Sequence, residues 1–162
     1  MKIRAATRDD WPAIWQFLRQ IVRAGDTFTW DPDVTEPDAC ALWMKQTPGR
    51  TIVATDDAGT VMGTAETHPN QGGGGSHIAN AGFMVDPAYG QRGVGRALAK
   101  HVITAARADG YRAIVFNAVA ATNLHAVRLY EDLGFSIIAT VPEGFRHPTA
   151  GYVGLHIMHR PL

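Results

Sequence analysis

The sequence has no excess charge of either sign, a single cysteine and no long apolar run. Fifteen basic and fifteen acidic residues give a formal net charge of zero, which argues against nucleic-acid or membrane-surface binding as the main role. Cys40 has no second cysteine with which to form an intramolecular disulfide. No apolar stretch approaches the ~20 residues of a membrane span, and no signal segment opens the chain. These absences predict a soluble, cytoplasmic protein.

The length of 162 residues fits one domain, residues 1–162, with a core of useful size. Apolar periodicity and turn residues predict an alternation of strands and helices. The expected strands cover residues 1–6, 51–55, 61–67, 77–85, 112–118, 135–140 and 151–160. The expected helices run from Thr7 to Gly25, from Thr35 through Met44, from the glycines near 93 through Ala105, and from Asn123 to Leu133. The fold class is therefore α/β (α+β).

Residues 80–100 combine a short strand, a loop with three glycines and the start of a helix. The glycines at 90, 93 and 95 lie before or inside the first helical turn, where backbone N–H groups lack intrahelical partners and the helix dipole is positive. Such a helix start binds an anion through its main chain, and glycine permits close approach of a phosphate. With Arg92 and Arg96 adding charge, the stretch predicts a diphosphate cradle.

Two common phosphate loops are excluded by specific residues. A nucleoside triphosphate loop needs Gly-Lys-Ser/Thr, and residues 93–97 provide neither the lysine nor the hydroxyl. A dinucleotide loop needs a third glycine, which Leu98 replaces, and an acidic residue about 20 positions on, which residues 115–119 lack.

The same stretch resembles motif A of the GCN5-related N-acetyltransferases (GNAT), and a second stretch resembles motif B of that family. The second carries Asn123, then Leu129-Tyr130, then Gly134-Phe135, in the family's order and spacing. The resemblance implies the acyl-CoA N-acyltransferase fold, with a mostly antiparallel sheet of about seven strands flanked by about four helices. It also implies that this sheet is splayed between the strands at 77–85 and 112–118.

Acetyl-CoA is the cosubstrate that this resemblance implies. Where the family usually has Gln or Arg before the paired glycines, this chain has Gly90, followed by Gln91 and Arg92. Asn123, which is also well placed as a helix N-cap, would contact the pantetheine arm, and Tyr130 would protonate the departing thiolate. The residues expected to bind the coenzyme are Phe83, Met84, Val85, Gln91, Arg92, Gly93, Val94, Gly95, Arg96 and Asn123.

Acetyl transfer also needs a base for the amine and N–H donors for the developing oxyanion. The family's donors are main-chain groups equivalent to residues 83–85, and Gly82 fits a strand bulge that would free them. By residue type the candidate bases are Glu66, His68, Glu143 and His147, of which Glu66 ranks first. An exposed strand end is the alternative interpretation of Glu66 and His68.

A metal site is not expected. His156 and His159 are three residues apart on a strand, which directs their side chains to opposite faces.

Substrate recognition is expected where the sheet splits. Asn80 and Asn117 fall at corresponding positions of two adjacent strands, where they would either tie the splay or face the substrate. The aromatic residues Phe28 and Trp30 form either a satellite core cluster or a pocket wall. Arg146, in an expected loop at 142–148, is a candidate carboxylate partner.

Segments 77–83 and 116–119 are similar to the yeast azetidine-2-carboxylate acetyltransferase, and the loop 26–33 is similar to the phosphinothricin acetyltransferase group. The resemblance implies direct acetyl transfer, in a ternary complex, to the amine of a small amino acid or analogue. A polyamine, aminoglycoside or protein amine remains an alternative acceptor, and a non-catalytic coenzyme A sensor remains an alternative function. A homodimer also stays open.

Overall fold

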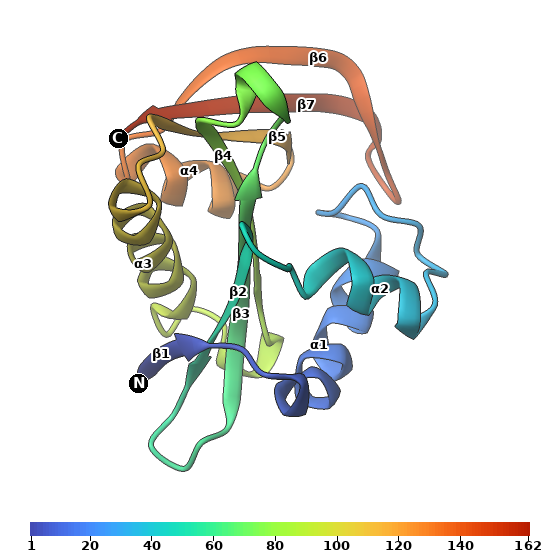
Figure 1. Cartoon of the computed structure of the whole chain (residues 1–162). Helices are drawn as coiled ribbons and strands as arrows, with labels where there is room; N and C mark the ends of the chain where they lie inside the picture. Colours follow the sequence, from blue (N-terminus) through green and yellow to red (C-terminus); the bar gives the residue numbers. More distant parts are fainter.

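A computed structural model describes all 162 residues and shows one seven-stranded sheet between two helical layers (Figure 1). The strand order is β1-β2-β3-β4-β5-β7-β6, and every neighbouring pair is antiparallel except β4 and β5, which are parallel. The strands are β1 (Lys2–Ala5), β2 (Arg50–Thr55), β3 (Val61–Pro69), β4 (Ile78–Val85), β5 (Ala113–Ala120), β6 (Ser136–His147) and β7 (Gly151–Pro161). The mostly antiparallel sheet confirms the predicted fold class.

Four α-helices pack on the sheet, two on each face (Figure 1). They are α1 (Trp11–Ala24), α2 (Glu36–Trp43), α3 (Val94–Ala108) and α4 (Leu124–Asp132). One buried cluster lies under α1 and α2 and a second under α3 and α4, so each layer has its own core. None of the helices is long and apolar enough to cross a membrane.

The helix ends follow the sequence closely. Thr7 begins a short 3₁₀ turn that leads into α1, and α1 ends at Gly25, whose φ of 67° is in the left-handed region that glycine adopts readily. In α3 the buried face includes Val94, Leu98 and Val102, whereas His101 is exposed.

The parallel pair β4–β5 is joined over two positions only, Ile78 with Ala113 and Ala79 with Ile114. Beyond these positions the two strands have no paired residues, although β4 continues to Val85 and β5 to Ala120. This separation confirms the predicted splay.

The predicted loop at 142–148 is wrong, because β6 continues through it to His147 and pairs with β7. This stretch contains Pro142 and Gly144, which are uncommon inside strands. The strand accommodates them by a register shift between Val141 and Phe145, with Glu143 at a positive φ of 52°. Because β6 is an edge strand, the N–H that Pro142 lacks is not needed by a further neighbour.

Candidate active site

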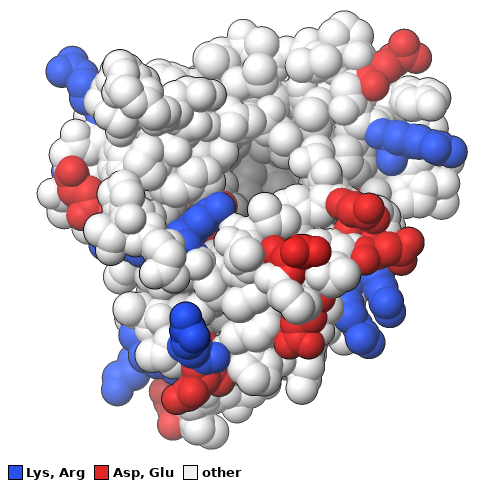
Figure 2. Space-filling view, turned by 45° about the vertical axis from the view of Figure 1, so that its right-hand side comes forward, with Lys and Arg blue, Asp and Glu red and all other residues white.

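Two cavities meet where β4 and β5 separate. The first, called here the splay cavity, has a volume of about 430 Å³ and lies between β4, β5 and residues 27–29. The second, the helix cavity, has a volume of about 810 Å³ and lies between the start of α3 and α4. Figure 2 shows one face of the molecule hollowed near its centre, with charged side chains of both signs around the hollow. The residues that line both cavities are Phe83, Val85, Asn123, Ala126 and Tyr130.

The helix cavity is bordered by the glycine loop and the first turn of α3. None of the backbone N–H groups of residues 91–96 donates a hydrogen bond within the protein. Gly93 is the N-cap of α3 and has a φ of 79°, which a residue with a side chain adopts only under strain. The loop therefore offers a row of free main-chain donors at a positive helix end, the arrangement that suits a diphosphate.

Gly95 leaves open space inside the helix cavity. A Cβ atom at this position would lie 3.5 Å from Cγ2 of Val85 and 3.8 Å from Cδ2 of Leu129, which are ordinary contact distances. Both neighbours line the cavity, so the missing side chain is not required by packing within the protein. The glycine instead keeps a space that a ligand can enter.

Most of the residues predicted to bind the coenzyme line the helix cavity. The exceptions are Met84 and Arg92. The Arg92 guanidinium lies over the ring of Tyr89, 5.4 Å from its centroid, in a cation–π contact. Gly90, in the place of the family's Gln or Arg, lines the cavity without a side chain. Arg96 lines it and is hydrogen-bonded to Asp132 of α4 at 2.7 Å.

The sequence interpretation missed His125 and Arg128, which line the helix cavity from α4. They are three residues apart, so they share one face of a helix, and the sequence alone could have predicted that. Only the packing of α4 shows that this face points into the cavity.

The backbone N–H and C=O groups of β4 point alternately toward β3 and toward the splay. The hydrogen bonds from Asn70 N–H to Ile78 C=O and from Asp86 N–H to Met62 C=O show that even-numbered residues of β4 face β3. The N–H groups of Phe83 and Val85 therefore point toward β5, where that strand has moved away. Met84, also predicted to bind the coenzyme, has its main chain directed at β3 and its side chain in the α1–α2 core.

The predicted bulge at Gly82 is wrong. The β3–β4 register runs without a shift from Gly63 opposite Val85 to Pro69 opposite Ala79. The divergence of β5 leaves the donors free without a bulge. A glycine is needed at position 82 for another reason. A Cβ there would lie 3.0 Å from Oε1 of Glu66 and 3.1 Å from the Trp43 ring.

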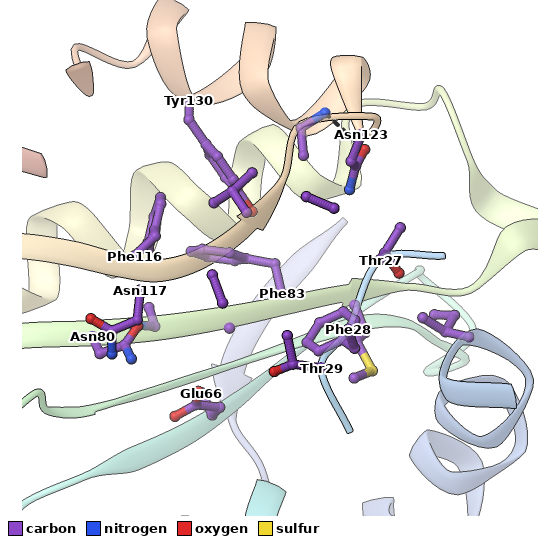
Figure 3. Close-up of a pocket in the computed structure, with 18 of the residues that line it drawn as sticks. Thr27, Phe28, Thr29, Glu66, Asn80, Phe83, Phe116, Asn117, Asn123 and Tyr130 are labelled. Carbon is purple, nitrogen blue, oxygen red and sulfur yellow. Dashed lines mark hydrogen bonds between the residues drawn. The ribbon is translucent and has the colours of Figure 1, made fainter. Parts of the chain in front are cut away.

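Tyr130 and Asn123 reach the junction of the two cavities from α4 and its first residue (Figure 3). The Tyr130 ring packs against Phe116 at a centroid distance of 4.5 Å and against Phe83 at 6.0 Å. Burial raises the pKa of the Tyr130 phenol, so the hydroxyl stays protonated. Asn123 does cap α4, because its Oδ1 accepts the Ala126 N–H at 3.2 Å, and its side-chain NH₂ has no protein partner.

The splay cavity brings together Glu66, Asn80, Asn117 and Phe28, and it does not include Trp30 or Arg146 (Figure 3). No lysine or arginine lines it, and Glu66 is its one carboxylate. The sequence interpretation missed Thr27 and Thr29, which flank Phe28 and also line the cavity. Two threonines in a loop match no binding motif, so the sequence did not single them out.

Trp30 and Arg146 have other surroundings. Trp30 packs edge-on against Phe28 and Trp43, at 6.3 and 6.0 Å, as part of the cluster under α1 and α2. Phe28 belongs to the same cluster and also lines the cavity, so both interpretations of this loop hold for it. Arg146 is exposed on β6.

Asn80 and Asn117 do not bond each other. The Asn80 Oδ1 accepts the N–H of Ala81 at 2.7 Å, and the Asn117 amide donates to Oδ1 of Asn70 at 2.7 Å. The amide NH₂ of Asn80 and the carbonyl oxygen of Asn117 have no protein partner. These groups are available to a ligand in the splay cavity.

Of the four candidate bases, Glu66 alone lines the splay cavity or the helix cavity. It is 7 % exposed and therefore not at an exposed strand end. His147 uses its Nδ1 to accept the N–H groups of Thr149 and Ala150, and Glu143 is exposed on β6. No group of three or more His, Cys, Asp or Glu side chains is arranged to hold a metal ion.

The model of the Acetyltransferase (GNAT) family matches residues 5–135 of this chain. The chain belongs to the GNAT family. Its structure is similar to a GCN5-related N-acetyltransferase from Kribbella flavida, with 53% identity, a TM-score of 0.97 and coverage of 99% of this chain and 97% of that chain. This GNAT protein is an N-acetyltransferase, an enzyme of the acyltransferase class.

Two curated relatives cover most of the chain. The N-acetyltransferase aca1 of Schizosaccharomyces pombe is 29% identical over 87% of this chain and 75% of the relative. The L-methionine sulfoximine/L-methionine sulfone acetyltransferase of Salmonella typhimurium is 26% identical over 88% of this chain and 84% of the relative. A phosphinothricin acetyltransferase from Sinorhizobium meliloti, solved with acetyl-CoA, has the same fold at 19% identity, with a TM-score of 0.89 and coverage of 99% and 88%.

Proposed function

We propose that this N-acetyltransferase transfers the acetyl group of acetyl-CoA to the amine of a small amino acid or amino-acid analogue, by direct attack in a ternary complex. The observation that carries the proposal is the junction of the two cavities. Their shared wall holds Tyr130 and the free main-chain donors of Phe83 and Val85. A thioester entering from the helix cavity and an amine entering from the splay cavity would meet there.

The helix cavity fits the coenzyme. The free N–H groups of residues 91–96 would bind the pyrophosphate, with Arg96 adding charge and Gly95 leaving room. The side-chain NH₂ of Asn123 is free to donate to an amide oxygen of the pantetheine arm. Acetyl-CoA supplies an acetyl group that is activated as a thioester.

Three groups of this chain would serve the transfer. The N–H groups of Phe83 and Val85 stabilise negative charge on the carbonyl oxygen as the amine attacks the acyl carbon. Glu66 takes the proton that the amine loses. Tyr130 gives its proton to the departing sulfur, and the neutral phenol that burial favours is the required form. Cys40 packs against the α1–α2 core and lines neither cavity, so the proposed transfer assigns it no role.

The splay cavity supports a small acceptor. Its one carboxylate suits an ammonium group, and the amides of Asn80 and Asn117 suit a second polar group such as a carboxylate, sulfone or phosphinate. The curated relatives include an enzyme for L-methionine sulfone, which is an amino-acid analogue. A polyamine would find one carboxylate for several cationic groups.

The test is thiol release from acetyl-CoA across a panel of amines. The panel contains L-methionine sulfone, phosphinothricin, azetidine-2-carboxylate, spermidine, an aminoglycoside and a peptide with an N-terminal alanine. We expect the highest kcat/KM among the first three. Preference for spermidine or the peptide would overturn the substrate class, and tight coenzyme binding without any turnover would leave the sensor function.

A further inference from the structure

The carboxylate of Glu66 is held from one side and open on the other. We infer that His68 and Lys45 position Glu66 so that its Oε1 atom, lying over Gly82, receives the ammonium group of the acceptor. This inference rests on the proposed acetyl transfer and adds two positioning residues, together with the identity of the receiving atom.

The strand register places these groups on one face of the sheet. Glu66 lies opposite Gly82, and His68 lies opposite Asn80, in a β3–β4 ladder without irregularity. Residues two apart on a strand, and residues paired across an antiparallel ladder, share a face. Glu66 and His68 are therefore neighbours on the α1–α2 face, next to the predicted substrate residue Asn80.

The Oε2 atom of Glu66 is occupied. Nδ1 of His68 lies 2.7 Å from it and is the donor to the carboxylate that the proposed transfer requires at Glu66, because a carboxylate only accepts hydrogen bonds. Nζ of Lys45 lies 3.8 Å from the same atom. The backbone of Lys45 is fixed in turn, because its N–H donates to the buried Oγ1 of Thr51 at 2.9 Å.

The Oε1 atom has no protein donor and lies over Gly82, the one glycine of β4. A Cβ at Gly82 would be 3.0 Å from Oε1, which is too close for an undisturbed contact. The same Cβ would lie 3.1 Å from the Trp43 ring, which is held by its hydrogen bond to Oγ1 of Thr64 at 3.1 Å. With His68 and Lys45 both on Oε2, the lone pairs of Oε1 remain for a cation in the splay cavity.

This arrangement matters for the rate. The amine must lose a proton before it attacks, and a group that accepts this proton has to lie within hydrogen-bond reach of it. The His68 hydrogen bond and the nearby Lys45 ammonium group hold Oε2, and this restricts where Oε1 can lie, because the two oxygens belong to one planar group. A displaced carboxylate would bind the acceptor in a geometry that reacts slowly.

The experiment compares His68→Ala with His68→Asn, whose side-chain amide can occupy the place of Nδ1. Kinetics are measured with the best amine of the panel above, and each variant's crystal structure records where Oε1 lies. We expect His68→Ala to lower kcat about 10- to 100-fold without changing the KM for acetyl-CoA, and to move Oε1 away from Gly82. His68→Asn should restore the position and most of the rate.

A third variant, Lys45→Met, should also lower kcat and move Oε1 away from Gly82. His101→Ala, on the exposed face of α3, is the matched control. A Glu66 carboxylate that stays over Gly82 in both His68→Ala and Lys45→Met would overturn the inference. The structures decide this point even if no amine is turned over, an outcome that would count against the proposed function alone.

Discussion

The guanidinium of Arg96 donates a hydrogen bond to the carboxylate of Asp132 at 2.7 Å, joining α3 to α4 at the edge of the helix cavity. Both side chains are largely exposed, so their pairing contributes little to the free energy of unfolding. The pair nevertheless competes with the coenzyme, because the same guanidinium is expected to approach the pyrophosphate.

Replacement of Asp132 by Asn should therefore strengthen coenzyme binding. We expect the KM for acetyl-CoA to fall about two- to fivefold, since an exposed pair of this kind is worth about 1 kcal/mol or less. Arg96→Gln, which removes the cation, should raise the same KM. If Asp132→Asn also raises it, Asp132 orients Arg96 and does not compete with the ligand.

The space at Gly95 predicts a variant that separates binding from folding. Gly95→Ala adds a Cβ at ordinary contact distances, and alanine is favoured over glycine in a helix by about 0.5–1 kcal/mol. The Tm should therefore stay the same or rise, while the KM for acetyl-CoA rises severalfold as the Cβ enters the cavity. Gly74→Ala is the control, because nothing lies within 4 Å of its Cβ position. An unchanged KM would place the diphosphate elsewhere.

Tyr130→Phe removes one hydroxyl and keeps the ring that packs against Phe83, Phe116 and Phe135. We expect kcat to fall about 100-fold with little change in Tm, if the phenol is the acid that protonates the thiolate. Because burial raises the pKa of this phenol, its ionisation should not limit the wild-type rate on the alkaline side up to about pH 10. Turnover that survives the substitution would remove this role.

The ion pair between Arg4 and Asp10 predicts how stability depends on pH. Two hydrogen bonds of 2.7 Å from Arg4, with further ones from Thr7, lower the pKa of Asp10 from 3.8 to about 2. The unfolded chain binds this proton at a higher pH, so the stabilisation is present above about pH 4 and is lost as the pH falls toward 2. Denaturant unfolding of wild type and Asp10→Asn between pH 2 and 6 measures it. The curves should converge at the acidic end, and parallel curves would contradict the assignment.

The parts of the fold that depend on neighbouring residues could be predicted from sequence. The glycine loop before α3 and the cap at Asn123 are local patterns, and the structure contains both. The splay was expected only through the family resemblance, because two-residue pairing between strands leaves no signal in either strand.

The parts that could not be predicted depend on contacts between distant segments. Gly82 suggested a bulge, but its reason is the approach of Glu66 from β3 and Trp43 from α2, which no local pattern shows. Arg146 suggested a carboxylate partner because of its charge, whereas the strand that carries it exposes its side chain. That Glu66 and His68 share a face follows from their spacing on β3, but only the β3–β4 register shows that Gly82 and Asn80 lie beside them.

The sparse pairing of β4 with β5 has a mechanical consequence. Four strands lie on one side of this seam and three on the other, and within the sheet only two residue pairs join them. A molecule that spans the gap would contact both β4 and β5 and would therefore restrain the separation of the two parts of the sheet. Occupancy of the site should then slow amide hydrogen exchange on both sides of the seam together, including in strands that never touch the ligand.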